Sequence, residues 1–139
     1  MLILDFSSSS FHLSGLKPSN SFEADVISFL ENWFDPTDFM MAQTSGSTGT
    51  PKPIRLTKQN MRKSAQMTCK YLRLQKGDIA LLAMPVNYIA GKLMLVRAAE
   101  IGLKLICVEP TAHLHWSTFE EVTDTIDFTA LTPMQVETS

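Results

Sequence analysis

Two short and almost wholly apolar segments, residues 79–84 and 103–108, constrain the fold of this chain more than any other feature. They read IALLAM and LKLICV, and the stretch between them, about 90–101, is predicted to be a helix that ends at Gly102. Strands that are apolar on both faces are typical of a parallel sheet held between layers of helices. We therefore predict that these two strands lie inside such a sheet.

The remaining sequence divides into predicted elements of ordinary length. The predicted strands are 2–6, 39–42, 54–56 and 128–131, and the predicted helices are about 21–34, 58–73 and 116–125, with a further helix starting at Pro133. Asn20 and Glu23 have the spacing of a capping box before the first helix, and Thr57 is a plausible N-cap for the second.

Strands and helices alternate from residue 39 onward, which predicts an α/β fold with a layered, mostly parallel sheet and helices on both faces. The 139 residues allow one domain, in which we distinguish a lead segment, 1–38, from an alternating core, 39–139. Ligands of parallel sheets bind at the carboxyl ends of strands. We therefore expect the loops 43–53 and 85–90, which both follow predicted strands, to lie on that rim.

The charges are unevenly distributed along the chain. Residues 1–50 carry a net charge of −5, residues 51–76 carry +8, and residues 77–139 carry −5, for a total of −2. The basic block is either a solvated helix face or a region that attracts anions. Apart from Tyr71, it lacks the interleaved aromatic residues of a nucleic-acid-binding protein, and it has no motif of one, so no nucleic-acid partner is expected.

The composition also bears on the compartment. No apolar run reaches the length of a membrane span, and the first ten residues lack the positive segment of a signal peptide. The two cysteines are too few for a disulfide framework. We expect a cytoplasmic protein without a membrane span.

The loop 43–53, QTSGSTGTPKP, carries the clearest chemical signal. Its two glycines let the backbone curl so that N–H groups approach an anion, and its lysine adds a compact positive charge. The candidate phosphate-binding residues are Thr44, Ser45, Gly46, Ser47, Thr48, Gly49, Thr50 and Lys52. A flexible linker is the alternative. The segment is neither a Walker A loop nor a nucleophile elbow, because prolines flank Lys52 and no Gly-x-Ser-x-Gly occurs.

The same residues resemble a known signature. QTSGSTGTPKPIRLT is similar to the phosphate-binding motif of the adenylate-forming (AMP-binding) superfamily, whose usual form is [ST]SG[ST]TGxPKG followed by an apolar residue and LTH. Residues 84–91, MPVNYIAG, resemble its LPxFHIxG segment, which borders the acyl pocket. The resemblance extends over about 39–138 and assigns Asn87, Tyr88 and Gly91 to the pocket. For Tyr88 the alternative is a loop aromatic residue packed on the rim of the core.

The resemblance implies a two-step reaction. A carboxylic acid attacks the α-phosphate of ATP to give an acyl-adenylate and pyrophosphate, and the thiol of coenzyme A then displaces AMP. The loop would hold the β- and γ-phosphates, with Lys52 as the charged group that positions the departing pyrophosphate. Mg²⁺ would accompany ATP, on ligands outside this chain. No metal site is expected within the chain itself, since His113, His115 and Glu109 are too few for a dedicated one.

Some features depart from the family pattern. Pro53 replaces the usual glycine and Lys58 the usual histidine, while the YGxTE segment, the ribose-binding Asp and the C-terminal lysine are missing. We therefore expect an N-terminal piece of a larger ligase, whose compact lead resembles the o-succinylbenzoate–CoA ligase subgroup. The alternative is a catalytically incomplete domain that binds a nucleotide or a partner. The open sheet edge of such a piece favours self-association.

Overall fold

The predicted unit around the two apolar strands is present. A computed structural model describes residues 1–43, 50, 52–87, 89–110 and 126–130. Strand β4 (Ile79–Leu82) leads through helix α3 (Ile89–Ile101) to strand β5 (Lys104–Cys107), and the two strands pair in parallel, Ile79 opposite Lys104. Gly102 ends α3 with a φ of +84°, a conformation that L side chains rarely adopt. This confirms the strand–helix–strand prediction.

Within the described residues, the main sheet has four strands. Their order is β1-β5-β4-β6, with β6 (Phe128–Ala130) parallel to β4 and β1 (Leu2–Asp5) antiparallel to β5. The sheet is thus mostly parallel, as predicted, with one antiparallel edge strand. That edge strand comes from the lead segment, so the first residues of the chain join the same sheet as the core.

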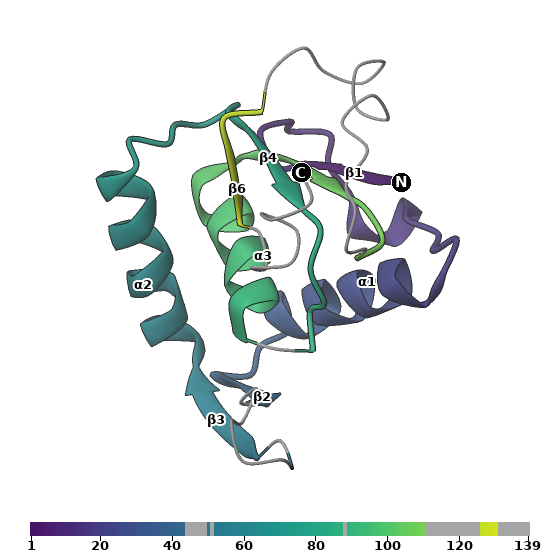
Figure 1. Cartoon of the computed structure of the whole chain (residues 1–139), viewed down its shortest axis with the longest axis vertical. Helices are drawn as coiled ribbons and strands as arrows, with labels where there is room; N and C mark the ends of the chain where they lie inside the picture. The colour runs from purple at the N-terminus through teal and green to yellow at the C-terminus, as the bar shows by residue number, and fades with distance from the viewer. Residues whose placement is uncertain (44–49, 51, 88, 111–125, 131–139) are drawn as a thin grey trace.

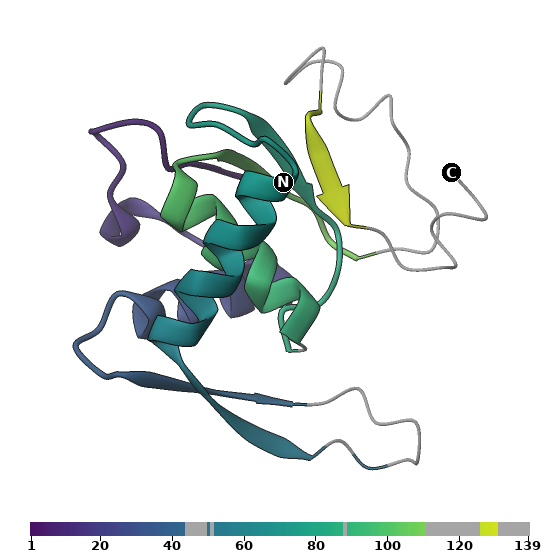
Figure 2. The same ribbon diagram turned by 90° about the vertical axis from the view of Figure 1, so that its left-hand side faces the viewer.

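The described helices form one layer over one face of this sheet. Helix α3 lies between α2 (Lys58–Tyr71) and α1 (Ser21–Trp33), as Figures 1 and 2 show, and a short 3₁₀ turn, η1 (Leu13–Gly15), precedes α1. The fully buried residues between sheet and helices include Leu4, Val26, Leu30, Leu82, Leu95 and Leu105. The predicted helix 116–125 and the one at Pro133 lie outside the described residues.

The opposite face of the sheet is apolar as well. Leu81 and Ile106 point away from the helical layer and are nevertheless fully buried, together with Ala83. The two apolar runs are therefore covered on both faces, which is the property that predicted a layered sheet. Cys69 and Cys107 are both buried free thiols.

Both predicted helix starts are confirmed. The side-chain oxygen of Asn20 accepts a hydrogen bond of 2.8 Å from the N–H of Glu23. The Glu23 carboxylate accepts one of 3.0 Å from the N–H of Ser19, one residue before the cap. At α2, the Thr57 hydroxyl accepts from the N–H of Asn60 at 3.2 Å. These bonds satisfy backbone donors that a helix start leaves without partners.

One prediction about the core is wrong. Strands β2 (Phe39–Gln43) and β3 (Pro53–Thr57) are not part of the main sheet but form a separate antiparallel ribbon, which projects from one end of the helical layer (Figures 1 and 2). The connection between them is nine residues, 44–52, whereas a parallel crossover needs a dozen or more. Burial alternates along β2: Met40 and Ala42 are buried, and their neighbours in the strand are exposed.

Candidate functional site

The glycine- and hydroxyl-rich loop joins the two strands of the β2–β3 ribbon. Its expected place after a strand of the parallel sheet is therefore wrong, since the preceding strand belongs to the ribbon. Residues 44–49, which include Thr44, Ser45, Gly46, Ser47, Thr48 and Gly49, lie outside the described residues. Thr50 and Lys52 are described, and both are exposed.

The second expected loop lies where it was predicted. The connection begins after Leu82 at the carboxyl end of β4, so this segment does follow a strand of the parallel sheet. The loop is shorter than the predicted 85–90, because α3 already begins at Ile89. Asn87 is exposed there, and Tyr88 lies outside the described residues. The candidate site is thus formed by segments from two separate sheets, the β2–β3 ribbon and the main sheet.

The two segments meet at a hollow, which we call the ribbon hollow. It has a volume of about 310 Å³, within the range of small-molecule sites. Its lining consists of Met41, Ala42, Gln43, Pro53, Asn87 and Lys92. Gln43 and Pro53 are the ribbon residues that flank the loop, so the hollow begins at the base of the loop and reaches the first turn of α3.

A neighbouring hollow of about 360 Å³, the α1 hollow, shares one wall with the first. Met41, Asn87 and Lys92 line both. The α1 hollow adds the exposed side of α1 and the turn that follows it, with the polar side chains Asp25, Ser28, Asn32, Asp35 and Thr37. The ribbon hollow is mainly apolar at its ribbon side, while the α1 hollow has a polar wall.

Lys92 is the functional candidate that the sequence analysis missed. It is half-buried in the first turn of α3, with its ammonium 5.2 Å from the centroid of the Phe29 ring. Burial lowers the pKa of Lys92, and the negative charge of Asp25 partly opposes this. A signal was present, because Lys92 is the one charged residue in the otherwise apolar run IAGKLMLV.

Gly91 has a packing role that the sequence did not reveal. It is buried, and a Cβ at this position would lie 2.1 Å from the carbonyl oxygen of Pro85 and 3.0 Å from the Cα of Val86. Gly91 lines neither of the two hollows described above. The missing side chain lets the first turn of α3 approach the backbone of the preceding loop, which positions Asn87 and Lys92 beside each other.

Lys58 ties the ribbon to the helical layer. Only 3% of it is exposed, and its ammonium donates to the Asn32 carbonyl at 2.6 Å and to the Asp35 carboxylate at 2.8 Å. The Asp35 carbonyl at 3.1 Å and the Thr37 hydroxyl at 3.2 Å are further acceptors. The hydrogen bond from Lys58, with others from Thr37, lowers the pKa of Asp35 to about 2. The residue that replaces the family histidine is thus a structural anchor.

The described residues provide no support for a metal site or for a membrane-spanning helix. Within the part of the chain that the structure describes, no three His, Cys, Asp or Glu side chains gather as a metal site would require. His113 and His115 fall outside it. Among the described helices, none combines the length and the apolar character needed to cross a membrane.

Comparison with known proteins identifies the family. The chain matches a solved acyl-CoA synthetase (AMP-forming)/AMP-acid ligase II-like protein from Dyadobacter fermentans with 38% identity and a TM-score of 0.77, over 90% of this chain and 35% of that one. It is also 26% identical over 103 residues to a probable CoA ligase, CCL9, from Humulus lupulus, covering 73% of this chain and 19% of the relative.

The sequence pattern of the AMP-binding enzyme family matches residues 3–138. The chain belongs to this family, which confirms the resemblance drawn from the loop signature. It spans about a third of the length of the bacterial structure and about a fifth of the hop relative.

Proposed function

We propose that the complete gene product containing this chain is an ATP-dependent carboxylic acid–CoA ligase. In the first step, a carboxylate oxygen of the acid attacks the α-phosphorus of ATP, giving an acyl-adenylate and releasing pyrophosphate. In the second, the thiol of coenzyme A attacks the acyl carbon, giving a thioester and releasing AMP. Membership of the AMP-binding enzyme family is the observation that carries this proposal.

The loop between β2 and β3 would hold the β- and γ-phosphates. The hydroxyls of Thr44, Ser45, Ser47, Thr48 and Thr50 and the backbone N–H groups of 46–49 would donate to phosphate oxygens, and Lys52 would place its ammonium beside the departing pyrophosphate. Thr50 and Lys52 are exposed, which supports this role, since solvent-facing side chains can reach a ligand. The loop would position and stabilise charge, without forming a covalent bond.

The acid would lie in the neighbouring ribbon hollow. Asn87 lines it, which supports the expected pocket role of this segment. Tyr88 would border the same pocket, and Gly91 would act through the fit between α3 and the loop. Mg²⁺ would neutralise ATP phosphate charge when bound. Its protein ligand would belong to the YGxTE segment of the family, which this sequence lacks.

Within this class, we infer that the complete gene product is an o-succinylbenzoate–CoA ligase. This enzyme would act in menaquinone biosynthesis, in the cytoplasm. The IAG sequence after the aromatic position supports this subgroup.

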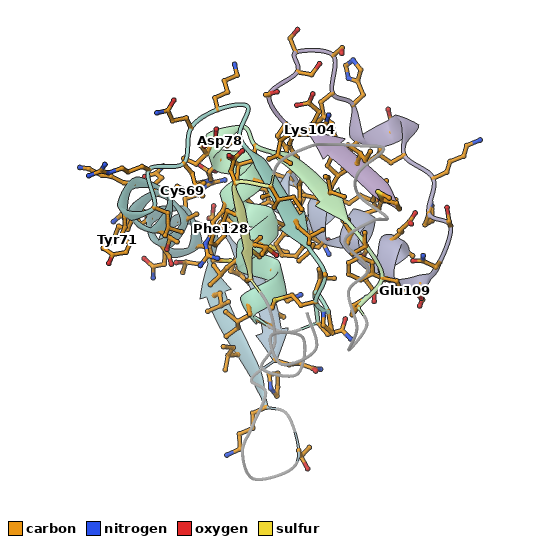
Figure 3. All side chains as sticks on the ribbon, turned by 45° about the horizontal axis from the view of Figure 1, so that its top comes forward. Cys69, Tyr71, Asp78, Lys104, Glu109 and Phe128 are labelled. Carbon is orange, nitrogen blue, oxygen red and sulfur yellow. The ribbon has the colours of Figure 1, made fainter. Side chains whose placement is uncertain are left out.

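We also infer that the isolated chain associates with itself. The exposure of Met67 (73%) and Tyr71 (86%) supports this, and Figure 3 shows Tyr71 projecting from α2.

The reaction can be tested on the complete gene product. We expect ATP-dependent pyrophosphate release with at least one acid from a panel of aromatic and dicarboxylic acids that includes o-succinylbenzoate. AMP and the thioester should form in equal amounts when coenzyme A is present, and acid-dependent ATP–pyrophosphate exchange should persist without it. Tight ATP binding with no exchange for any acid would contradict the ligase proposal and favour a nucleotide-binding domain.

A further inference from the structure

The ribbon hollow has an uneven chemical lining. Three of its residues, Met41, Ala42 and Pro53, are apolar, while Gln43 and Asn87 are neutral and polar. Lys92 is the sole charged residue among the described residues that line it, and no carboxylate is among them. A ligand in this hollow would therefore have an apolar body and meet a single positive charge on α3.

The Lys92 ammonium has no counter-ion at contact distance. Among the described residues, none of the ion pairs within 4.0 Å includes it, and its contact is with the face of the Phe29 ring. Asp25 acts on Lys92 through its charge from farther away. The buried Lys58, by contrast, has the Asp35 carboxylate at 2.8 Å. A half-buried cation without a counter-ion at contact distance is costly, so such a residue gains from an incoming anion.

The ribbon residues beside the loop set the direction in which a bound acid would lie. Gln43 and Pro53 are the residues that bracket the loop, so the carboxylate to be activated must approach the hollow at this end to reach the phosphates. Lys92 belongs to α3, whereas Gln43 and Pro53 belong to the ribbon, and Lys92 lines both this hollow and the α1 hollow. A molecule that fills the hollow from the loop to α3 therefore places its far end beside the ammonium.

We propose that Lys92 pairs with a second, non-reacting carboxylate of the acid substrate, and so selects dicarboxylic acids with an apolar centre over monocarboxylic acids. The proposal rests on the proposed function for the identity of the reacting end. A charge-assisted hydrogen bond to a partly desolvated ammonium is about twice as strong as a neutral one, which is enough to discriminate between two acids of the same shape. Asn87, which lines the same hollow, can donate to the second carboxylate oxygen.

A matched pair of acids tests this inference. The first acid is o-succinylbenzoate, and the second is 4-oxo-4-phenylbutanoate, which lacks only the ring carboxylate. In the complete gene product, Lys92→Met should raise the KM of the diacid at least about tenfold and change that of the monoacid less than about twofold. Lys92→Arg should restore most of the preference, and Lys63→Met, on the exposed side of α2, should behave as wild type.

Calorimetric titration of the 139-residue chain with the same two acids separates this inference from the proposed function. Preferential binding of the diacid that Lys92→Met abolishes would support the inference even if the gene product activates no acid of the panel, a result that would overturn the ligase proposal alone. Equal losses for both acids in Lys92→Met, an unchanged preference, or no binding of the diacid to the wild-type chain would overturn the role of Lys92.

Discussion

Replacing Gly91 with alanine is expected to lower the free energy of unfolding by about 3 kcal/mol, because the new methyl group meets backbone that cannot move aside. The Cβ would lie 2.1 Å from the Pro85 carbonyl oxygen and 2.8 Å from its carbon, both far inside contact distance. For a chain of this size the loss corresponds to a fall in melting temperature of roughly 10 °C. Thermal unfolding followed by circular dichroism measures it.

Gly15→Ala is the matched control for this substitution. Gly15 is exposed, and a Cβ there would meet no atom within 4 Å. The control should therefore unfold within a degree or two of the wild type. A melting temperature for Gly91→Ala that matches the control would show that α3 does not need its close approach to the preceding loop.

Lys58→Met is expected to lower the free energy of unfolding by about 2 kcal/mol, because the buried Lys58 side chain loses its charge-assisted hydrogen bonds to partly buried acceptors. Methionine keeps most of the apolar stem but cannot donate to the Asn32 carbonyl or the Asp35 carboxylate. The link between the ribbon and the end of α1 depends on these bonds. Urea unfolding at neutral pH, compared with Lys63→Met on the exposed side of α2, measures the loss.

The same variant has a characteristic pH dependence. The folded protein holds the pKa of Asp35 at about 2, below the ordinary 3.8, through its hydrogen bonds with Lys58 and Thr37. The resulting stabilisation is complete above the ordinary pKa and is lost as the pH falls toward 2. The stability difference between wild type and Lys58→Met should therefore narrow between pH 5 and pH 2.5. A difference that stays constant over this interval would show that the Lys58–Asp35 pair contributes nothing to it.

The main sheet could be predicted because its signals are local. Continuous apolar runs at β4 and β5 and a glycine after α3 are visible in the sequence, and each reports directly on burial or backbone conformation. The ribbon was harder to predict, because FMMA is apolar throughout although only alternate residues of β2 are buried. The nine-residue connection was the available signal, since it is too short for a parallel crossover.

The candidate site could be predicted from the sequence only in part. The loop signature named the phosphate-binding candidates and led to the correct family. The role of Lys58 depends on acceptors 21 to 26 positions earlier in the chain, and no local pattern reports such a contact. Lys92 likewise gains its significance from Phe29 and from the ribbon residues across the hollow. Contacts between distant segments of the chain determine the roles of both lysines.

The most direct test of the account is the rate of acid-dependent ATP–pyrophosphate exchange in the complete gene product carrying Lys52→Ala. If the loop between β2 and β3 holds the β- and γ-phosphates, exchange should slow at least about tenfold, equivalent to about 1.4 kcal/mol in the barrier. Lys17→Ala, at an exposed position outside both hollows, should keep the wild-type rate. An exchange rate for Lys52→Ala equal to that of Lys17→Ala would contradict the assignment of this loop to ATP.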